Sequence, residues 1–215
     1  MKKHIQIAID GPAGAGKSTI AKIIAKKLDI LYLDTGALYR SIGYFVKKSG
    51  LEAEKALKKL KLEIKYVDFA QQIIVNGENV TDLIRTPEMS LMASSVSKIP
   101  EVREFLLETQ REIARNNSVI MDGRDIATVI MPDADVKIFL TASAEKRAKR
   151  RFNETKEDVT FEQVLADVIA RDTQDTTRKI APLRPAFDSV LLNTTDMTLD
   201  ESINRAIEII TEKIG

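Results

Sequence analysis

The chain has 215 residues, 44% of them hydrophobic, which is enough for one medium-sized domain with a real core. Its 33 basic and 32 acidic residues nearly cancel, which argues against general binding to nucleic acid or membrane surfaces and leaves any anion site to local clusters of arginine. The absence of cysteine excludes disulfides and thiolate metal sites, and the single histidine, His4, argues against histidine-based catalysis or metal binding.

Strands and helices alternate in the first 50 residues. The short β-branched run at residues 5–9 predicts a strand, and apolar residues at helical spacing predict a helix over 17–28. Residues 30–34 predict a second strand, and the helix that follows it stops at Gly50. Strand, helix and strand with short connections indicate a parallel α/β sheet.

The period of the pattern changes over residues 62–82, where apolar and polar residues alternate. This segment contains Asn76-Gly77, the strongest short signal for a hairpin turn. We therefore expect a small antiparallel insert. Helical spacing returns at residues 87–97 and, after a proline, at 101–116.

The rest of the chain returns to alternating strands and helices. Strands are expected at 118–122, 136–140 and 189–193, and helices at 144–155, 160–177 and 199–214. The complete order predicts a parallel core of five strands. No apolar segment approaches the roughly 20 residues of a membrane span, and the first is too short for a signal peptide. We expect a cytoplasmic protein without membrane or nucleic-acid partners.

The stretch DGPAGAGKST, directly behind the first strand, fits the pattern G-x-x-x-x-G-K-[ST] at Gly11, Gly16, Lys17 and Ser18. Glycines let backbone N–H groups turn toward an anion, and the N-terminus of the next helix adds its positive field. Lys17 is expected to reach the β- and γ-phosphates, and the Ser18 hydroxyl to bind Mg²⁺. The motif predicts binding of a nucleoside triphosphate with Mg²⁺, and it does not specify the acceptor.

The nature of the acceptor decides which other residues the site needs. A hydroxyl acceptor needs a general base, whereas a phosphate is already mostly dianionic and needs cations that offset the repulsion between two polyanions. Arg40 lies early in a predicted helix, and DGRD places Arg124 and Asp125 just past the strand at 118–122, at the sheet edge where ligands bind. These positions favour a phosphate acceptor.

Two further groups of arginines lie toward the C-terminus. Arg171, Asp175 and Arg178 are spaced to share one helix face, provided that the helix expected at 160–177 extends to residue 178. The stretch EKRAKRR supplies the second group, on a predicted helix: Arg147, Arg150 and Arg151.

These stretches together resemble the bacterial cytidylate kinases, within the nucleoside monophosphate kinase family. The resemblance is carried by IDGPAGAGKST, YLDTGALYR, IPEVREFLLETQR, MDGRDIATVIMPDADVKIFLTAS, RAKRR and RDTQDTTRKIAPL. It implies an α/β P-loop fold of three layers, with a five-stranded parallel sheet, a small antiparallel β insert and a helical lid. It also implies a single kinase domain over 1–215, with its core at 1–34 and 118–215, a CMP-binding segment with the β insert at about 35–117, and a lid at about 147–160.

The reaction implied by this resemblance is transfer of the γ-phosphoryl group of Mg-ATP to the phosphate of CMP or dCMP, giving ADP and the diphosphate. ATP and CMP or dCMP would be the partners, Mg²⁺ the cofactor, and the protein a monomer. The ATP phosphates would be held by Gly11, Pro12, Ala13, Gly14, Ala15, Gly16, Lys17, Ser18 and Thr19, with Arg147, Arg150 and Arg151 on the lid. Ser18 would be the metal ligand.

The resemblance assigns the acceptor site in the same way. Thr35, Arg40, Arg124 and Arg178 would surround the CMP phosphate; Ser94, Arg103 and Asp125 would contact the cytosine edge; Arg171 and Asp175 would contact the sugar. The catalytic cations would be Lys17, Arg40, Arg124 and Arg178. The family often has serine where Thr35 stands, and Ser95 and Ser97 are alternatives to Ser94. Asp122 is a candidate for orienting the water around Mg²⁺.

Other functions remain open on the residues alone. A kinase of a small hydroxyl acceptor would need a base, for which Asp34 is placed, and a kinase of another monophosphate would share the P-loop. A nucleotide-dependent switch would not need Arg103, Arg171 and Arg178. RNA binding through EKRAKRR is disfavoured because no aromatic residues are interleaved with the basic ones.

Overall fold

The computed structural model describes residues 4–67, 70–154 and 159–215. Its main sheet has the strand order β2-β6-β1-β7-β8, and every pairing is parallel. The strands are β1 (Gln6–Asp10), β2 (Leu31–Asp34), β6 (Val119–Gly123), β7 (Val136–Thr141) and β8 (Val190–Asn193). The predicted five-stranded parallel sheet is therefore confirmed.

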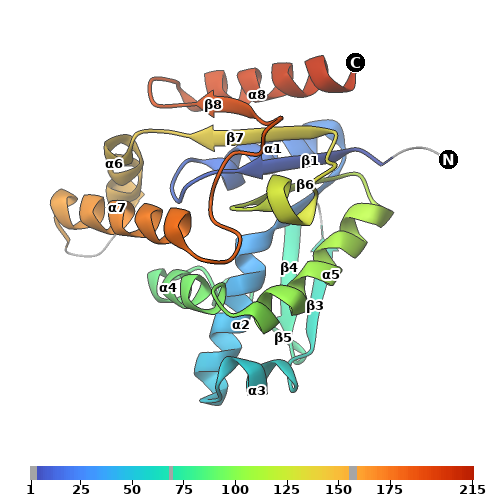
Figure 1. The fold of residues 1–215 in the computed structure, drawn as a ribbon, viewed down its shortest axis with the longest axis vertical. Coiled ribbons are helices and arrows are strands. Elements are labelled where there is room, and N and C mark those ends of the chain that lie inside the picture. The colour runs from blue at the N-terminus through green and yellow to red at the C-terminus, as the bar shows by residue number, and fades with distance from the viewer. Residues whose placement is uncertain (1–3, 68–69, 155–158) are drawn as a thin grey trace.

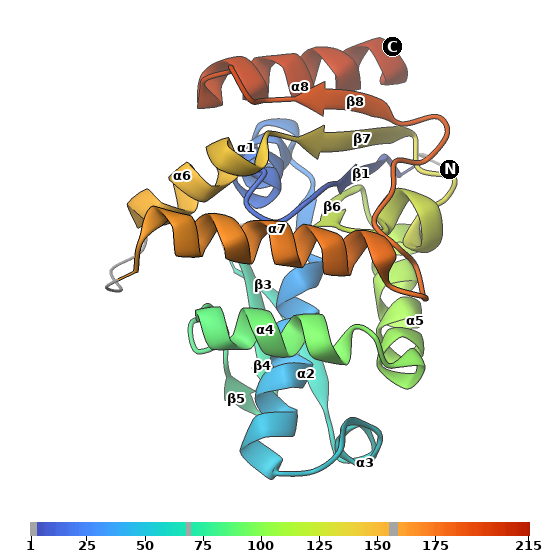
Figure 2. The same ribbon diagram turned by 60° about the vertical axis from the view of Figure 1, so that its left-hand side comes forward.

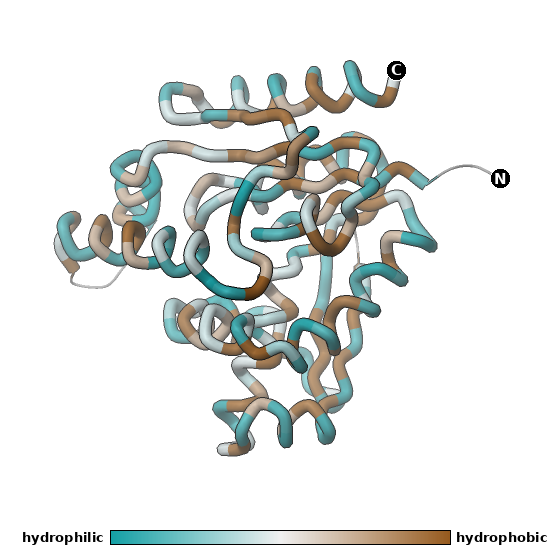
Figure 3. Tube along the Cα trace, in the orientation of Figure 1, coloured by the Kyte–Doolittle hydropathy of each residue, from teal (hydrophilic) through white to brown (hydrophobic). Residues whose placement is uncertain are grey.

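Helices cover both faces of this sheet and give the three layers that the sequence predicts (Figure 1). Because side chains alternate along a strand, Ile7 and Ile9 of β1 face α1 and α8, whereas Ala8 faces the layer that contains α2 and α5. Along α8, hydrophobic and hydrophilic residues alternate with the turns of the helix (Figure 3). The helices are α1 (Lys17–Leu28), α2 (Thr35–Ser49), α3 (Ala53–Leu57), α4 (Pro87–Val96), α5 (Pro100–Asn116), α6 (Ala144–Glu154), α7 (Phe161–Thr177) and α8 (Leu199–Ile214).

The antiparallel insert is a second, smaller sheet of β3 (Leu62–Val67), β4 (Ala70–Val75) and β5 (Glu78–Asn79). Asn76 and Gly77, with φ of 49° and 85°, form the predicted two-residue turn, here between β4 and β5. In both ribbon views the insert lies together with α2, α3 and α4, beside the main sheet (Figures 1 and 2). The insert therefore belongs to the half of the molecule for which the sequence predicts acceptor binding.

Capping residues mark the ends of several helices. The side chain of Asp34 caps α2, whose C-terminus is closed by Gly50 with φ of 65°. Thr160 with Gln163 and Thr198 with Glu201 form capping boxes at the starts of α7 and α8. The predicted helix boundaries are correct to within one or two residues.

Three features differ from the expectations. The short helix α3 and a π-helical turn at Ile126–Ile130 were not predicted. Helix α7 ends at Thr177, and Arg178 has an extended backbone with φ of −61° and ψ of 141°. Arg178 therefore does not share the helical face of Arg171 and Asp175. The short spans lack a full hydrophobic period, so the sequence carried no signal for them.

The division into core, CMP-binding segment and lid stays a prediction. Part of the expected lid, residues 155–158, lies outside the described residues, whereas the preceding α6 is described. Among the described residues, no helix has both the length and the apolar character that crossing a membrane requires.

Candidate active site

The carboxyl ends of β1, β2, β6 and β7 meet at one edge of the main sheet, and the arrowheads of β1 and β7 point there toward α6 and α7 (Figure 1). This is the edge where open α/β sheets bind ligands. Two adjoining cavities lie here, with volumes of about 850 Å³ and 360 Å³. Residues Ala13–Ser18 of the P-loop line the larger cavity, and part of the same loop lines the smaller.

The P-loop has the backbone that its glycines predict. Gly11, Gly14 and Gly16 have φ of 149°, 73° and 93°, which other residues adopt only with strain. A Cβ on Gly11 would also lie 1.9 Å from the carbonyl oxygen of Leu140 in β7. The loop therefore packs directly against β7. The first residues of α1, which follow the loop, line the larger cavity.

Lys17 is buried at this start of α1 and donates from Nζ to the Pro12 carbonyl at 2.7 Å. Burial, and next the neighbouring Arg124, lower the pKa of Lys17 to about 7. Ser18 and Thr19 are exposed, and Ser18 lines both cavities. Lys17 and Ser18 thus lie at the wall between the two cavities, with Ala13 and Gly14, whereas Thr19 lines the larger cavity alone.

The predicted lid arginines lie on α6 and line the larger cavity. Arg147 is buried, pairs with Asp172 at 2.5 Å and donates to the carbonyl of Ala13 at 3.1 Å. Arg150 donates to the carbonyls of Ala15 and Thr194 at 3.3 and 3.0 Å. Two of the three arginines thus support the P-loop backbone in this structure. Arg151 lines the same cavity.

Four of the arginines that line or adjoin the smaller cavity come from four different segments and are paired with carboxylates. Arg40 pairs with Asp34 at 2.7 Å, and Arg124 pairs with Asp175 of α7 at 2.7 Å. Both oxygens of the Asp125 carboxylate are paired, one with Arg103 and the other with Arg178 at 3.1 Å. The residues predicted to bind the acceptor phosphate and to read its base are therefore adjacent.

The other predicted acceptor residues lie in the same place. The Thr35 hydroxyl donates to the carbonyl of Asp122 at 2.7 Å. The Nε atom of Arg171 is buried without a hydrogen-bond partner, and burial, then Arg124, lower the pKa of Arg171 to about 10. Arg171 lines both cavities, which leaves its guanidinium group available to a ligand.

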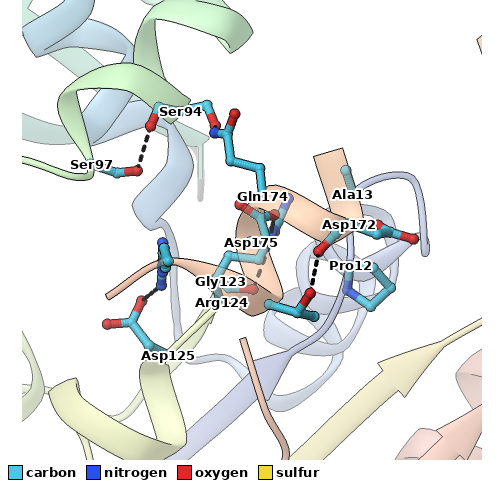
Figure 4. A network of polar contacts seen from close by, with 12 residues as sticks. Pro12, Ala13, Ser94, Ser97, Gly123, Arg124, Asp125, Asp172, Gln174 and Asp175 are labelled. Atoms are coloured by element: carbon cyan, nitrogen blue, oxygen red, sulfur yellow. Dashed lines mark hydrogen bonds and ion pairs between the residues drawn. The ribbon is translucent and has the colours of Figure 1, made fainter. Parts of the chain in front are cut away.

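Ser94 and Ser97 both line the smaller cavity, whereas Ser95 is exposed and does not. Ser97 Oγ donates to the Ser94 carbonyl at 2.9 Å, and Gln174 of α7 donates to Ser94 Oγ. Figure 4 shows Ser94 and Gln174 meeting across the gap between α4 and α7. Two of the three serines thus remain candidates for contact with the base.

Two buried carboxylates organise the edge of the sheet. Asp10 accepts hydrogen bonds from the backbone N–H groups of Ile126 and Ala127 at 2.8 and 2.7 Å, which ties the end of β1 to the segment after Asp125. Asp122 accepts from the Tyr32 hydroxyl at 2.7 Å. Burial raises the pKa of each carboxyl group from 3.8 to about 6.

Sequence reasoning missed four side chains here: Tyr32, Gln71, Arg85 and Gln174. Gln71 lies on β4 in register with the buried Ile73 and Val75, so a polar residue on a buried face was the available signal. No pattern marks the other three. Tyr32 and Gln174 bind partners from distant segments, and Arg85 lies in a loop without periodic spacing.

A glycine loop followed by a helix, at the switch point of a parallel sheet and beside clustered arginines, defines a P-loop kinase. The family model described as "Cytidylate kinase" matches residues 7–212. The chain belongs to the cytidylate kinase family, as the sequence motifs predict.

Curated relatives agree with this assignment, and a solved structure agrees with the fold. The chain is 50% identical to the cytidylate kinase of Caldicellulosiruptor saccharolyticus, over 99% of this chain and 98% of that protein. It is also 50% identical to the cytidylate kinase of Carboxydothermus hydrogenoformans, over 97% and 98% of the two chains. Its fold is similar to that of the shikimate kinase of Bacteroides thetaiotaomicron, with a TM-score of 0.52 at 12% identity over 96% and 98%.

Proposed function

We propose that this chain transfers the γ-phosphoryl group of ATP to the phosphate of CMP or dCMP. Convergence of Arg40, Arg124 and Arg178 on a cavity adjoining the P-loop is the observation that carries the proposal. An acceptor phosphate would meet three guanidinium groups there, and guanidinium forks suit phosphate oxygens. The larger cavity, lined by the P-loop and α6, would hold ATP.

Phosphoryl transfer requires that ATP and CMP, both polyanions, bind with the attacking oxygen in line with the bond that breaks. The bond between the γ-phosphorus and the oxygen of ADP breaks as a bond forms to an oxygen of the CMP phosphate. Because that oxygen is already ionised, no general base is required. Lys17 and the arginines stabilise the charge that spreads over the transferred group, and they do so without reorganising during the step.

A polyanion near Lys17 also changes the lysine itself. Burial lowers the pKa of Lys17 to about 7. Phosphate oxygens beside Nζ favour the charged form, so nucleotide binding would raise this pKa again. Binding of ATP is therefore expected to take up a fraction of a proton near neutral pH.

Cytosine recognition rests on Asp125. Its carboxylate accepts from Arg103 and Arg178 and retains capacity for a further hydrogen bond from the exocyclic amine of cytosine. Arg103 and a serine of α4 would donate to the ring acceptors. Uracil presents a carbonyl in place of the amine, and a carbonyl facing a carboxylate leaves both groups unsatisfied.

Asp34 is committed elsewhere, which disfavours a hydroxyl acceptor. One of its oxygens accepts from the backbone N–H of Ala37 at 2.9 Å, and the other pairs with Arg40 at 2.7 Å. A carboxylate that caps a helix and holds an arginine is poorly placed to accept a proton from a substrate hydroxyl.

The residues at the wall between the cavities fit Mg²⁺. Among the described residues, no cluster of three or more acidic or histidine side chains could hold a metal ion by itself. Mg²⁺ suits such a site because it keeps several waters and uses substrate phosphates as ligands. Ser18 would hold the ion directly, and Asp122, which lines both cavities, would orient its water shell. When bound, the ion neutralises charge on the β- and γ-phosphates.

A monomeric state, a location in the cytoplasm and the absence of nucleic-acid partners are also proposals, supported by the family resemblance. Gel filtration of the purified protein tests the first of them.

An acceptor screen tests the proposed reaction. ADP formation would be followed with CMP, dCMP, UMP, AMP and shikimate, each with Mg-ATP. CMP and dCMP are expected to be converted to diphosphates, UMP poorly, and AMP and shikimate not at all. Failure to form CDP from CMP would reject the proposal, and slow ATP hydrolysis alone would favour a switch protein.

A further inference from the structure

The wall between the two cavities is where the transferred phosphoryl group must pass if the proposed function is correct. Of the described residues that line both cavities, three are cationic: Lys17, Arg85 and Arg171. Lys17 and Arg171 are already part of the predicted site. Arg85 comes from the loop between β5 and α4 and has no role so far.

The loop places Arg85 firmly although its side chain is exposed. The preceding residue, Ile84, is buried to 1% exposure and anchors the loop in the core. The following residue, Thr86, caps α4 by accepting from the backbone N–H of Met89. Arg85 itself donates its backbone N–H to the Asp82 carbonyl at 3.3 Å. Its side chain therefore leaves a fixed point of the backbone and lines the same two cavities as the P-loop.

The guanidinium group of Arg85 is also uncommitted. It forms no hydrogen bond or ion pair with any of the described residues, whereas Arg40, Arg103 and Arg124 are each paired with a carboxylate. An arginine that is already paired must give up or share its partner to bind phosphate, and Arg85 need not. Its charge is thus free for a ligand at the wall between the cavities.

We propose that Arg85 is a further catalytic residue, which contacts the transferred phosphoryl group from the acceptor half of the molecule. The proposal rests on the proposed kinase function and deepens it. In the transition state charge spreads over the equatorial oxygens of the transferred group, and a guanidinium group there stabilises it more than it stabilises the separate substrates. Arg85 stays protonated throughout, and no bond to it forms or breaks.

Arg85→Ala and Arg85→Lys test this role. With saturating ATP and CMP, Arg85→Ala is expected to lower kcat about 100-fold or more, as loss of one transition-state donor does elsewhere. KM for either nucleotide should change less than threefold. Arg85→Lys keeps the charge but loses the planar fork and should recover part of kcat. Added guanidinium ion should partly restore Arg85→Ala.

Two control variants separate this role from disturbance of the loop or of net charge. Leu83→Ala changes an exposed residue of the same loop, and Arg115→Ala removes an exposed arginine that lines neither cavity. Both should keep wild-type kcat, and all variants should keep the melting temperature of the wild type. A kcat of Arg85→Ala within threefold of wild type, or equal losses in Leu83→Ala, would overturn the proposal.

The wild-type reaction distinguishes failure of this inference from failure of the proposed function. If wild-type protein converts CMP to CDP and Arg85→Ala does so equally well, only the role of Arg85 is wrong. If wild-type protein forms no CDP, the proposed function is wrong and the role of Arg85 falls with it.

Discussion

Gln71 of the insert is hydrogen-bonded twice to the backbone of Asp34, at the end of β2. Its Oε1 accepts from the Asp34 N–H at 2.7 Å, and its Nε2 donates to the Asp34 carbonyl at 3.4 Å. Asp34 in turn holds Arg40 at 2.7 Å. A side chain of the antiparallel sheet thus fixes the backbone of the residue whose carboxylate holds Arg40, a predicted phosphate-binding arginine.

Replacing Gln71 should weaken acceptor binding without affecting the donor site. Gln71→Ala removes the buried hydrogen bonds, which should weaken the binding free energy of CMP by about 1 kcal/mol. This corresponds to an increase of about fivefold in KM for CMP. KM for ATP should stay unchanged, since Gln71 does not line the larger cavity. Steady-state kinetics with each nucleotide varied would measure this split.

The neighbouring Gln72 provides a matched control for this prediction. It points to the opposite face of β4 and forms no hydrogen bond with the described residues through its side chain. Gln72→Ala should behave as the wild type. Equal rises in KM for ATP and CMP would show that Gln71 has only a general structural role.

Asp125→Asn should reduce discrimination between the two pyrimidines. An amide can donate to the uracil carbonyl that a carboxylate repels, so the ratio of kcat/KM for CMP to that for UMP should fall at least about tenfold. Absolute activity should also fall, because Arg103 and Arg178 lose their charged partner. The kcat/KM values for both substrates would be compared with those of Asp133→Asn, at an exposed position outside both cavities.

Asp122 should make the unfolding free energy depend on pH in the direction opposite to that of a paired carboxylate. Burial raises its pKa from 3.8 to about 6, so the folded state binds its proton more tightly than the unfolded chain does. Between these pH values the contribution of Asp122 falls as the pH rises, by up to about 1.4 kcal/mol per pH unit. It is fully present below pH 3.8 and lost above pH 6.

Asp122→Asn isolates this contribution, since an amide oxygen can still accept from Tyr32. Urea denaturation from pH 4 to pH 7 should show the variant gaining stability relative to wild type as the pH rises. Parallel curves for the two proteins would contradict the buried, proton-binding state of Asp122.

Gly43→Ala should destabilise the acceptor half of the molecule. A Cβ at Gly43 of α2 would lie 2.7 Å from the Cβ of Met92 in α4, a contact too short to keep. Overpacking costs about 1–3 kcal/mol, and the better helix propensity of alanine offsets at most about 1. The melting temperature should fall, and KM for CMP should rise because α4 carries Ser94 and Ser97. An unchanged melting temperature would show that α2 and α4 move apart far enough to accommodate the added methyl group without loss of stability.

Much of the fold could be predicted because its elements are long and periodic. The strands β1 and β6 are buried on both faces and form short apolar runs, whereas the helices α1, α5, α7 and α8 each bury one face; both patterns are visible in the chain. By contrast, α3 and the π-helical turn at Ile126–Ile130 span five residues each, fewer than two helical turns. Their presence depends on the tertiary contacts around them.

The candidate site was predictable where a short motif brings its own geometry, as in the P-loop and DGRD. Arg178 was selected by its helical spacing and given its role by the family resemblance, although it lies beyond the end of the helix. Gln71 and Arg85 were missed because their surroundings come from segments far away in the chain. Gln71 contacts Asp34, 37 residues away, and Arg85 reaches the two cavities only because the chain folds around it, so local spacing identifies neither.

The contact between Gly11 and the Leu140 carbonyl has a consequence for how this chain can vary. Even the smallest side chain would collide there with the backbone of a central strand, which no rotamer change relieves. Position 11 could be randomised in a mutant library, and cells that depend on the activity of this enzyme for growth could be selected. The surviving clones should carry only glycine codons at position 11, even if neighbouring positions tolerate other residues.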